Sequence, residues 1–115
     1  EDIALLWHGG VRSGTDIAKL LGLRATAVCV GLALALAAGG AIEGDDVVFA
    51  GGLDQASRDE GATLFLRAMR AEASIMPRCT GKTDIRNLEP EDLRSITLVT
   101  AEATGIPIAG RGIPA

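Results

Sequence analysis

Cysteine, histidine and aromatic residues are scarce in this sequence of 115 residues, and their scarcity excludes several kinds of site. Two cysteines, Cys29 and Cys79, are too few for a disulfide scaffold or for a zinc site made of four cysteines. The single histidine, His8, excludes a histidine-rich metal centre built from this chain alone. With three aromatic residues, the core must rest on Leu, Ile, Val and Ala.

Basic residues are also fewer than acidic ones. The sequence has 11 basic and 15 acidic residues, which gives a formal net charge of -4. A general nucleic-acid-binding protein is expected to be basic, so we predict no nucleic-acid partner. The chain is 48% hydrophobic, which argues against disorder, and its length allows one domain at most.

One uncharged stretch, residues 25–42, approaches the length of a membrane span. It consists mostly of Ala and Gly, and Gly31 and the pair Gly39-Gly40 divide it, so a buried strand followed by a buried helix is the better interpretation. We predict no membrane association. The sequence begins without Met inside an apolar run and shows no secretory signal, so we expect a cytoplasmic piece of a longer protein whose N-terminal part is missing.

The first 31 residues have the order strand, glycine loop, helix, strand. Residues 3–7 and 27–30 are short continuous apolar runs, typical of strands buried on both faces. Between them, the glycine-containing loop 8–14 leads into a helix from about Thr15, and Gly31 closes the second strand. The helical connection predicts parallel neighbouring strands.

The second half is predicted to be helical after a glycine-rich, acidic connector. Ser57 and Glu60 have the spacing of a capping box, and Pro77 lies at the expected end of the helix that follows. A last helix is predicted to begin at Pro90 and to end at Gly105. In the helix that follows Ser57, the apolar residues predicted to share one face are Ala62, Phe65, Leu66, Met69, Ala73 and Met76.

The two glycine loops are the strongest candidates for a binding site. In the loop 8–14, Gly9 and Gly10 allow backbone amides to approach an anion ahead of a helix N-terminus, and Arg12 adds a cation. A tight turn without a ligand remains the alternative for this loop taken alone. Gly31 ends the adjacent strand, and two such loops side by side are typical of the phosphate site after the seventh and eighth strands of a (β/α)8 barrel.

Two segments also resemble known proteins. Residues 9–19 and 25–31 look like the end of an FMN-binding barrel, a pattern shared by 2-hydroxy acid oxidases, IMP dehydrogenases and glutamate synthases. The C-terminal segments 79–83, 87–93 and 105–110 resemble more narrowly the end of FMN-binding glutamate synthase-type proteins, which include the catalytic subunit of methylglutamate synthase.

The resemblance implies an α/β fold: about the last two βα units of a TIM (β/α)8 barrel plus a helical C-terminal extension. Its expected divisions are residues 1–42 for the barrel units, 43–57 for the connector and 58–115 for an extension packing on the barrel. The implied function is FMN-dependent reductive formation of glutamate or N-methylglutamate from an imine derived from 2-oxoglutarate. The implied partners are 2-oxoglutarate, an amino donor and the missing N-terminal barrel or partner subunits.

Carried over by position, the resemblance implies that the FMN phosphate is held by backbone amides, with Arg12 beside it. His8 stands where the family more often has a small or acidic residue, and Leu32 stands where a Thr often follows the glycine. The implied cofactor-binding residues are Gly9, Gly10, Arg12, Gly31 and Leu32.

Glutamate synthases carry a cysteine cluster soon after the eighth strand, but residues 35–52 contain no cysteine. We therefore predict no iron–sulfur cluster and no metal site, and assign Cys29 to packing within its strand. The tripeptide Gly81-Lys82-Thr83 resembles the end of a P-loop, yet Met76 stands where that motif needs a glycine. The acidic residues after Leu88 are predicted to cap a helix.

Two other functions stay open. One is a different FMN-dependent barrel oxidoreductase of the 2-hydroxy acid oxidase type, against which residues 87–110 argue. The other is a non-catalytic relic or interaction module, whose apolar surface a partner would have to cover. No catalytic residue is identified, and the segment alone is expected to be inactive.

Overall fold

The computed structural model describes residues 3–49 and 51–111 and shows a long, open molecule. Its principal extents are 61 × 35 × 32 Å and its radius of gyration is 17.3 Å, whereas a globular domain of this length has a radius of about 13 Å. The accessible surface is 8282 Å², compared with roughly 5,900 Å² for a folded monomer of this mass. The chain therefore buries less of its surface than a self-contained domain would.

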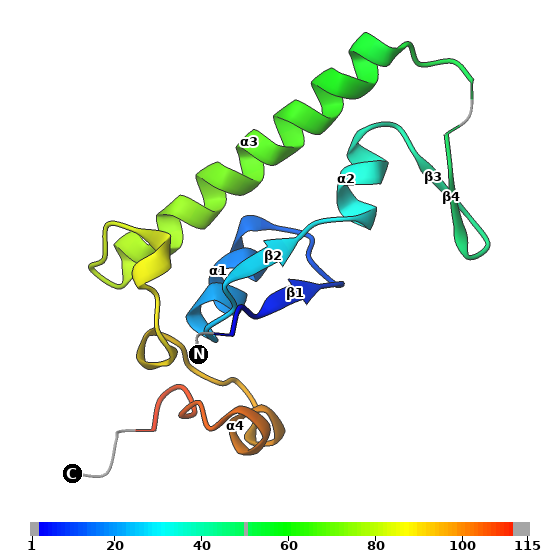
Figure 1. Cartoon of the computed structure of the whole chain (residues 1–115). Helices are drawn as coiled ribbons and strands as arrows, with labels where there is room; N and C mark the ends of the chain where they lie inside the picture. Colours follow the sequence, from blue (N-terminus) through cyan, green and yellow to red (C-terminus); the bar gives the residue numbers. More distant parts are fainter. Residues whose placement is uncertain (1–2, 50, 112–115) are drawn as a thin grey trace.

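A β–α–β unit forms the N-terminal part (Figure 1). Strand β1 (Leu6–His8) is followed by helix α1 (Gly14–Gly22) and strand β2 (Ala27–Cys29), and the two strands pair in parallel. Helix α2 (Leu32–Ala37) begins directly after Gly31. The predicted order of strand, glycine loop, helix and parallel strand is thus confirmed, with shorter strands than the apolar runs suggested.

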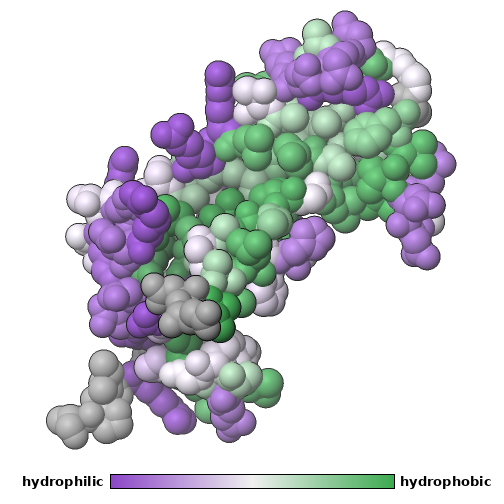
Figure 2. Space-filling view, in the orientation of Figure 1, coloured by the Kyte–Doolittle hydropathy of each residue, from purple (hydrophilic) through white to green (hydrophobic). Residues whose placement is uncertain are grey.

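The prediction that both strands are buried on both faces is wrong. Leu6 is 65% exposed and Trp7 47% exposed, and the preceding Ile3 is 90% exposed. Parallel strands become buried when helices and further strands cover them, and this sheet has two strands among the described residues. Figure 2 shows hydrophobic side chains gathered along the side of the molecule that carries this sheet and α2.

A β-hairpin, which the sequence interpretation missed, follows α2. Strands β3 (Ala41–Glu43) and β4 (Asp46–Val48) pair antiparallel, with Glu43 opposite Asp46. The two-residue turn begins with Gly44 at a φ of 63°, a conformation that glycine adopts without strain. The hairpin therefore crosses from the expected barrel segment, residues 1–42, into the expected connector, residues 43–57.

Helix α3 (Gln55–Cys79) is the longest element, with 25 residues. The side chain of Asp54 accepts a hydrogen bond from the Ser57 amide at 2.8 Å, so the predicted capping box of Ser57 and Glu60 is wrong and the helix begins earlier than expected. Pro77 lies in the last turn, at the end of the helix as predicted, and is fully buried.

The predicted apolar stripe of α3 packs in part on α1. Met69 and Ala73 are buried as expected, whereas Leu66 is 47% exposed. Glycine allows the closest approach: a Cβ on Gly14 would lie within 3.0 Å of the backbone of Met69 and Ala73. The two helices can therefore touch backbone to backbone at this point.

The C-terminal part is less helical than predicted. Two 3-10 turns, η1 (Ile85–Asn87) and η2 (Pro90–Asp92), precede helix α4 (Leu98–Thr104). The single helix predicted from Pro90 is wrong, because the chain extends after η2 and Ser95 forms a parallel bridge with Ile108.

The predicted end of this region is confirmed, since Gly105 caps α4 in the left-handed conformation with a φ of 72°. Within the described ranges, no helix combines the length and the apolar character that crossing a membrane requires.

Candidate functional site

A cavity of about 380 Å³ lies at the carboxyl ends of β1 and β2. It is lined by all the residues that the sequence singled out for cofactor binding, namely Gly9, Gly10, Arg12, Gly31 and Leu32. The two glycine loops are neighbours because their parallel strands end at the same edge, with His8 opposite Cys29. The other lining residues are His8, Val11, Cys29, Ala33 and Leu36. What the cavity binds stays a prediction.

The glycines of the first loop leave open space around their backbone. Gly9 has a φ of 107° and Gly10 a φ of 68°, and a Cβ on either would meet no atom within 4 Å. A Cβ on Gly31 would lie 3.7 Å from Nε2 of His8, an ordinary contact. Among the described residues and outside the β1–β2 ladder, the amides of Gly10, Gly31 and Leu32 have no protein acceptor. The residues that carry these unpaired amides line one cavity, which is an arrangement suited to an anion.

Arg12 lies at the edge of the cavity and is held by Asp16. The backbone N–H of Arg12 donates to Oδ2 of Asp16 at 3.0 Å, and Nε of Arg12 lies 3.5 Å from the same oxygen. The hydrogen bond from the Arg12 amide, followed by the charge of Arg12, keeps the pKa of Asp16 below its usual value. The Arg12 side chain is 83% exposed, so its guanidinium can turn toward a ligand at little cost.

The N-terminus of α1 does not face the cavity as an open anion site, which corrects one expectation from the sequence. The Gly14 amide donates to Oε2 of Glu72 at 2.9 Å, and the Thr15 hydroxyl donates to the other carboxylate oxygen. The side chain of Ser13 accepts from the Asp16 amide at 3.3 Å. The bond from the Thr15 hydroxyl, followed by the bond from the Gly14 amide, lowers the pKa of Glu72. A carboxylate of α3 therefore already occupies the helix end that was expected to favour a bound phosphate.

Cys29 was assigned to packing within its strand, but it is exposed and lines the cavity. As the last residue of β2 it stands opposite His8, which likewise ends β1 and lines the cavity. Their position at the ends of two parallel strands is the sequence signal that points to both residues. His8 places an imidazole beside Gly31, where the resembling proteins more often have a small or acidic side chain.

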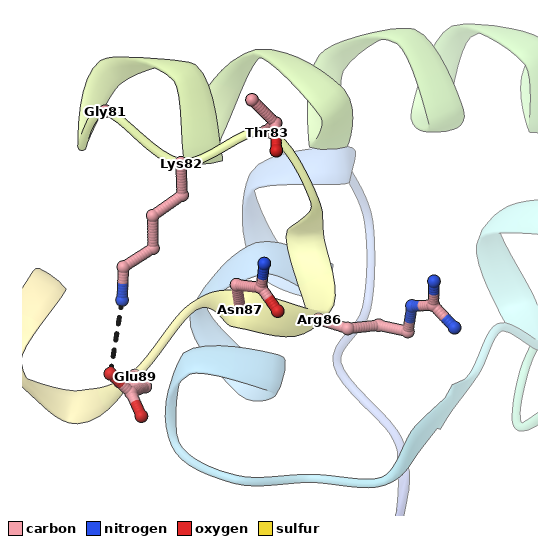
Figure 3. Close-up of a pocket in the computed structure, with 6 residues that line it drawn as sticks. All are labelled: Gly81, Lys82, Thr83, Arg86, Asn87 and Glu89. Carbon is pink, nitrogen blue, oxygen red and sulfur yellow. Dashed lines mark hydrogen bonds and ion pairs between the residues drawn. The ribbon is translucent and has the colours of Figure 1, made fainter.

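A second cavity, of about 520 Å³, surrounds Lys82 (Figure 3). Nζ of Lys82 lies 2.7 Å from Asp92 and 3.3 Å from Glu89, and these bonds, the Asp92 bond first, raise the lysine's pKa. Arg86 is paired with Asp84 at 2.7 Å and lowers the pKa of that carboxyl to about 2.

The cations at the second cavity are thus neutralised by the protein itself, which agrees with the absence of a complete P-loop motif. The carboxylate of Asp92 accepts from the amide of Glu89 at 2.9 Å, so the predicted capping role of the acidic residues is confirmed for η2. The remaining lining residues are Gly81, Thr83 and Asn87.

Comparison with known proteins gives one relative. The chain is 30% identical to a glutamate synthase large subunit-like protein from Rhizobium meliloti (strain 1021) over 137 aligned residues. The alignment covers 94% of this chain and 31% of that protein, so the chain spans about a third of the relative's length. No family model matches the sequence. No solved structure matches it either. The chain is therefore a distant relative of a glutamate synthase large subunit-like protein.

Proposed function

We propose that this chain is the C-terminal portion of an FMN-dependent, glutamate synthase-like oxidoreductase. In this proposal, β1–α1 and β2–α2 are the last two units of a (β/α)8 barrel, and the part from α3 onward is an extension that packs on it. The distant relative supports the family, and the order of parallel strands and helices fits two consecutive barrel units. The exposed apolar side chains of β1 fit strands built to be covered by others.

The observation that carries the proposal is the pair of glycine loops at two adjacent strand ends, whose residues line one cavity. Gly9, Gly10, Gly31 and Leu32 line one cavity, and the space beside the first two glycines is open to a ligand. A phosphate group is the part of FMN that such donors recognise. Arg12 would add a charge-assisted contact from the edge of the cavity.

This chain's part in the reaction is to anchor the cofactor. A bound flavin supplies the electrons that reduce an imine, formed from 2-oxoglutarate and an amino donor, to glutamate or N-methylglutamate. The groups that bind these substrates would lie mostly on other barrel strands, supplied by a longer chain or by a partner subunit. A closed barrel takes about 250 residues, so we expect the 115 residues alone to be inactive.

A comparison of two flavins tests the anchor directly, because FMN and riboflavin differ in the phosphate alone. The labelled chain is titrated with each compound and the backbone amides are followed by NMR. We expect weak FMN binding that shifts the amides of Gly9, Gly10, Gly31 and Leu32, and no such shift with riboflavin. Equal effects of the two flavins, or no effect of either, would contradict a phosphate anchor at this cavity.

The wider activity is tested in a chimera. The segment of the Rhizobium relative that matches this chain is replaced by residues 1–115, and FMN content and reductive formation of glutamate are measured against the unaltered relative. Retention of stoichiometric FMN would support the barrel assignment. A folded chimera without FMN, made from a relative that binds it, would favour the non-catalytic module.

A further inference from the structure

Helix α3 carries a second apolar stripe, on a side that does not contact α1. Leu64 is 55% exposed and Ile75 is 51% exposed, and between them Ala68 and Ala71 are also exposed. The spacings of four, three and four residues place these side chains on one face of the helix. Met69 and Ala73, which pack on α1, lie on a different side. The long helix thus has one occupied apolar face and one open to solvent.

We propose that this open stripe joins two copies of the chain through an antiparallel pair of α3 helices. In that alignment, Leu64 of each copy faces Ile75 of the other, and Ala68 faces Ala71. The small alanines at the centre let the two backbones approach closely, while the large residues at both ends cover the gap. The same surface serves both copies, as a two-fold symmetric interface requires.

Charge on the flank of the stripe selects the antiparallel direction. Glu60 and Arg78 are separated by 18 residues, which is five helical turns, so both lie on the same edge of the stripe. In an antiparallel pair this edge faces its own counterpart, and the alignment that matches Leu64 with Ile75 also brings Glu60 of one copy near Arg78 of the other.

Most charges of the helix follow the same polarity. Acidic residues at its N-terminal end are Asp54, Asp59 and Glu60, and basic residues toward its C-terminal end are Arg67, Arg70 and Arg78. There is one exception at each end. Arg58 at the acidic end donates to the carbonyl of Ala38 and lies over the ring of Phe49. Glu72 toward the basic end accepts from the Gly14 amide and the Thr15 hydroxyl of α1. Inverting one helix against its copy therefore places its acidic end beside a basic end.

The oligomeric state of the intact chain tests the interface. Sedimentation equilibrium over a range of concentrations is expected to show a dimer, and Leu64→Asp and Ile75→Asp are each expected to shift it to monomer. Leu66→Asp is the matched control, because Leu66 is 47% exposed but lies on the other side of the helix. Circular dichroism establishes that each variant keeps its helix.

Reversing the charges tests the direction of pairing. Glu60→Arg or Arg78→Glu alone is expected to weaken the dimer about tenfold, since each removes two symmetric ion pairs and creates repulsion. The double variant is expected to restore the original dissociation constant. The proposal is overturned if the chain stays monomeric, if Leu64→Asp and Leu66→Asp behave alike, or if the double variant dimerises no better than the single ones. A dimer formed through the exposed β1–β2 surface would be insensitive to all of these changes and would overturn it as well.

Discussion

The contact of α1 with α3 depends on the absence of a side chain at Gly14. A Cβ at this position would approach the Met69 carbonyl oxygen and the Ala73 nitrogen within 3.0 Å, and it would lie 2.8 Å from Cβ of Glu72. The first two are backbone atoms in the middle of a 25-residue helix, so they cannot turn aside as a flexible side chain would. Gly14→Ala must therefore push the two helices apart.

Two opposing effects set the size of the change. Overpacking of this kind costs about 1–3 kcal/mol, and separation also lengthens the bond of 2.9 Å from the Gly14 amide to Glu72. Alanine favours the helical conformation over glycine by up to about 1 kcal/mol. The steric cost is the larger, so we expect Gly14→Ala to lower the free energy of unfolding by about 1–2 kcal/mol.

Urea unfolding followed by circular dichroism measures this loss, which corresponds to a midpoint lowered by roughly 1 M. Gly22→Ala in the same helix is the control, because its Cβ would meet the flexible side chain of Leu93 at 3.2 Å. We expect the control to match or exceed the parent in stability. A Gly14→Ala protein as stable as the parent would refute the backbone contact between the helices.

Three further predictions concern the core, the α1–α3 contact and the cavity. Met69→Ala should lower the free energy of unfolding by about 2–4 kcal/mol in the same urea assay, because Met69 is 4% exposed and its loss leaves a void against α1. The lowered pKa of Glu72 means that its contribution to stability is present above its ordinary value of 4.5 and is lost as the pH falls through the folded-state pKa. Glu72→Gln should therefore destabilise the chain at neutral pH and lose this effect in acid, and a difference independent of pH would contradict the role of the carboxylate. Gly10→Val should abolish the FMN-dependent amide shifts, since φ is 68° there, whereas Gly81→Val, which also replaces a left-handed glycine but lies away from the cavity, should preserve them.

The sequence by itself determined the local order of the chain and the position of its candidate site. Apolar runs separated by a glycine loop and a helix specify the parallel unit, and the same pattern places Gly9 and Gly31 at neighbouring strand ends. The left-handed end of α4 at Gly105 and the acidic cap of η2 were predictable as well. These features depend on sterics and hydrogen bonds between residues close in sequence, so a pattern of a few residues is enough to encode them.

The tertiary structure decided what those elements meet. Glu72 lies more than fifty residues from Gly14 in sequence, and no local pattern indicates that it occupies the N-terminus of α1. The hairpin at Gly44 forms through pairing across its turn, while the surrounding composition favoured a connector. The exposure of Leu6 and Trp7 depends on the number of neighbouring strands, although their apolar run indicated burial. Burial and ligand access are properties of the whole arrangement, because each depends on which surfaces cover a residue as well as on the residue itself.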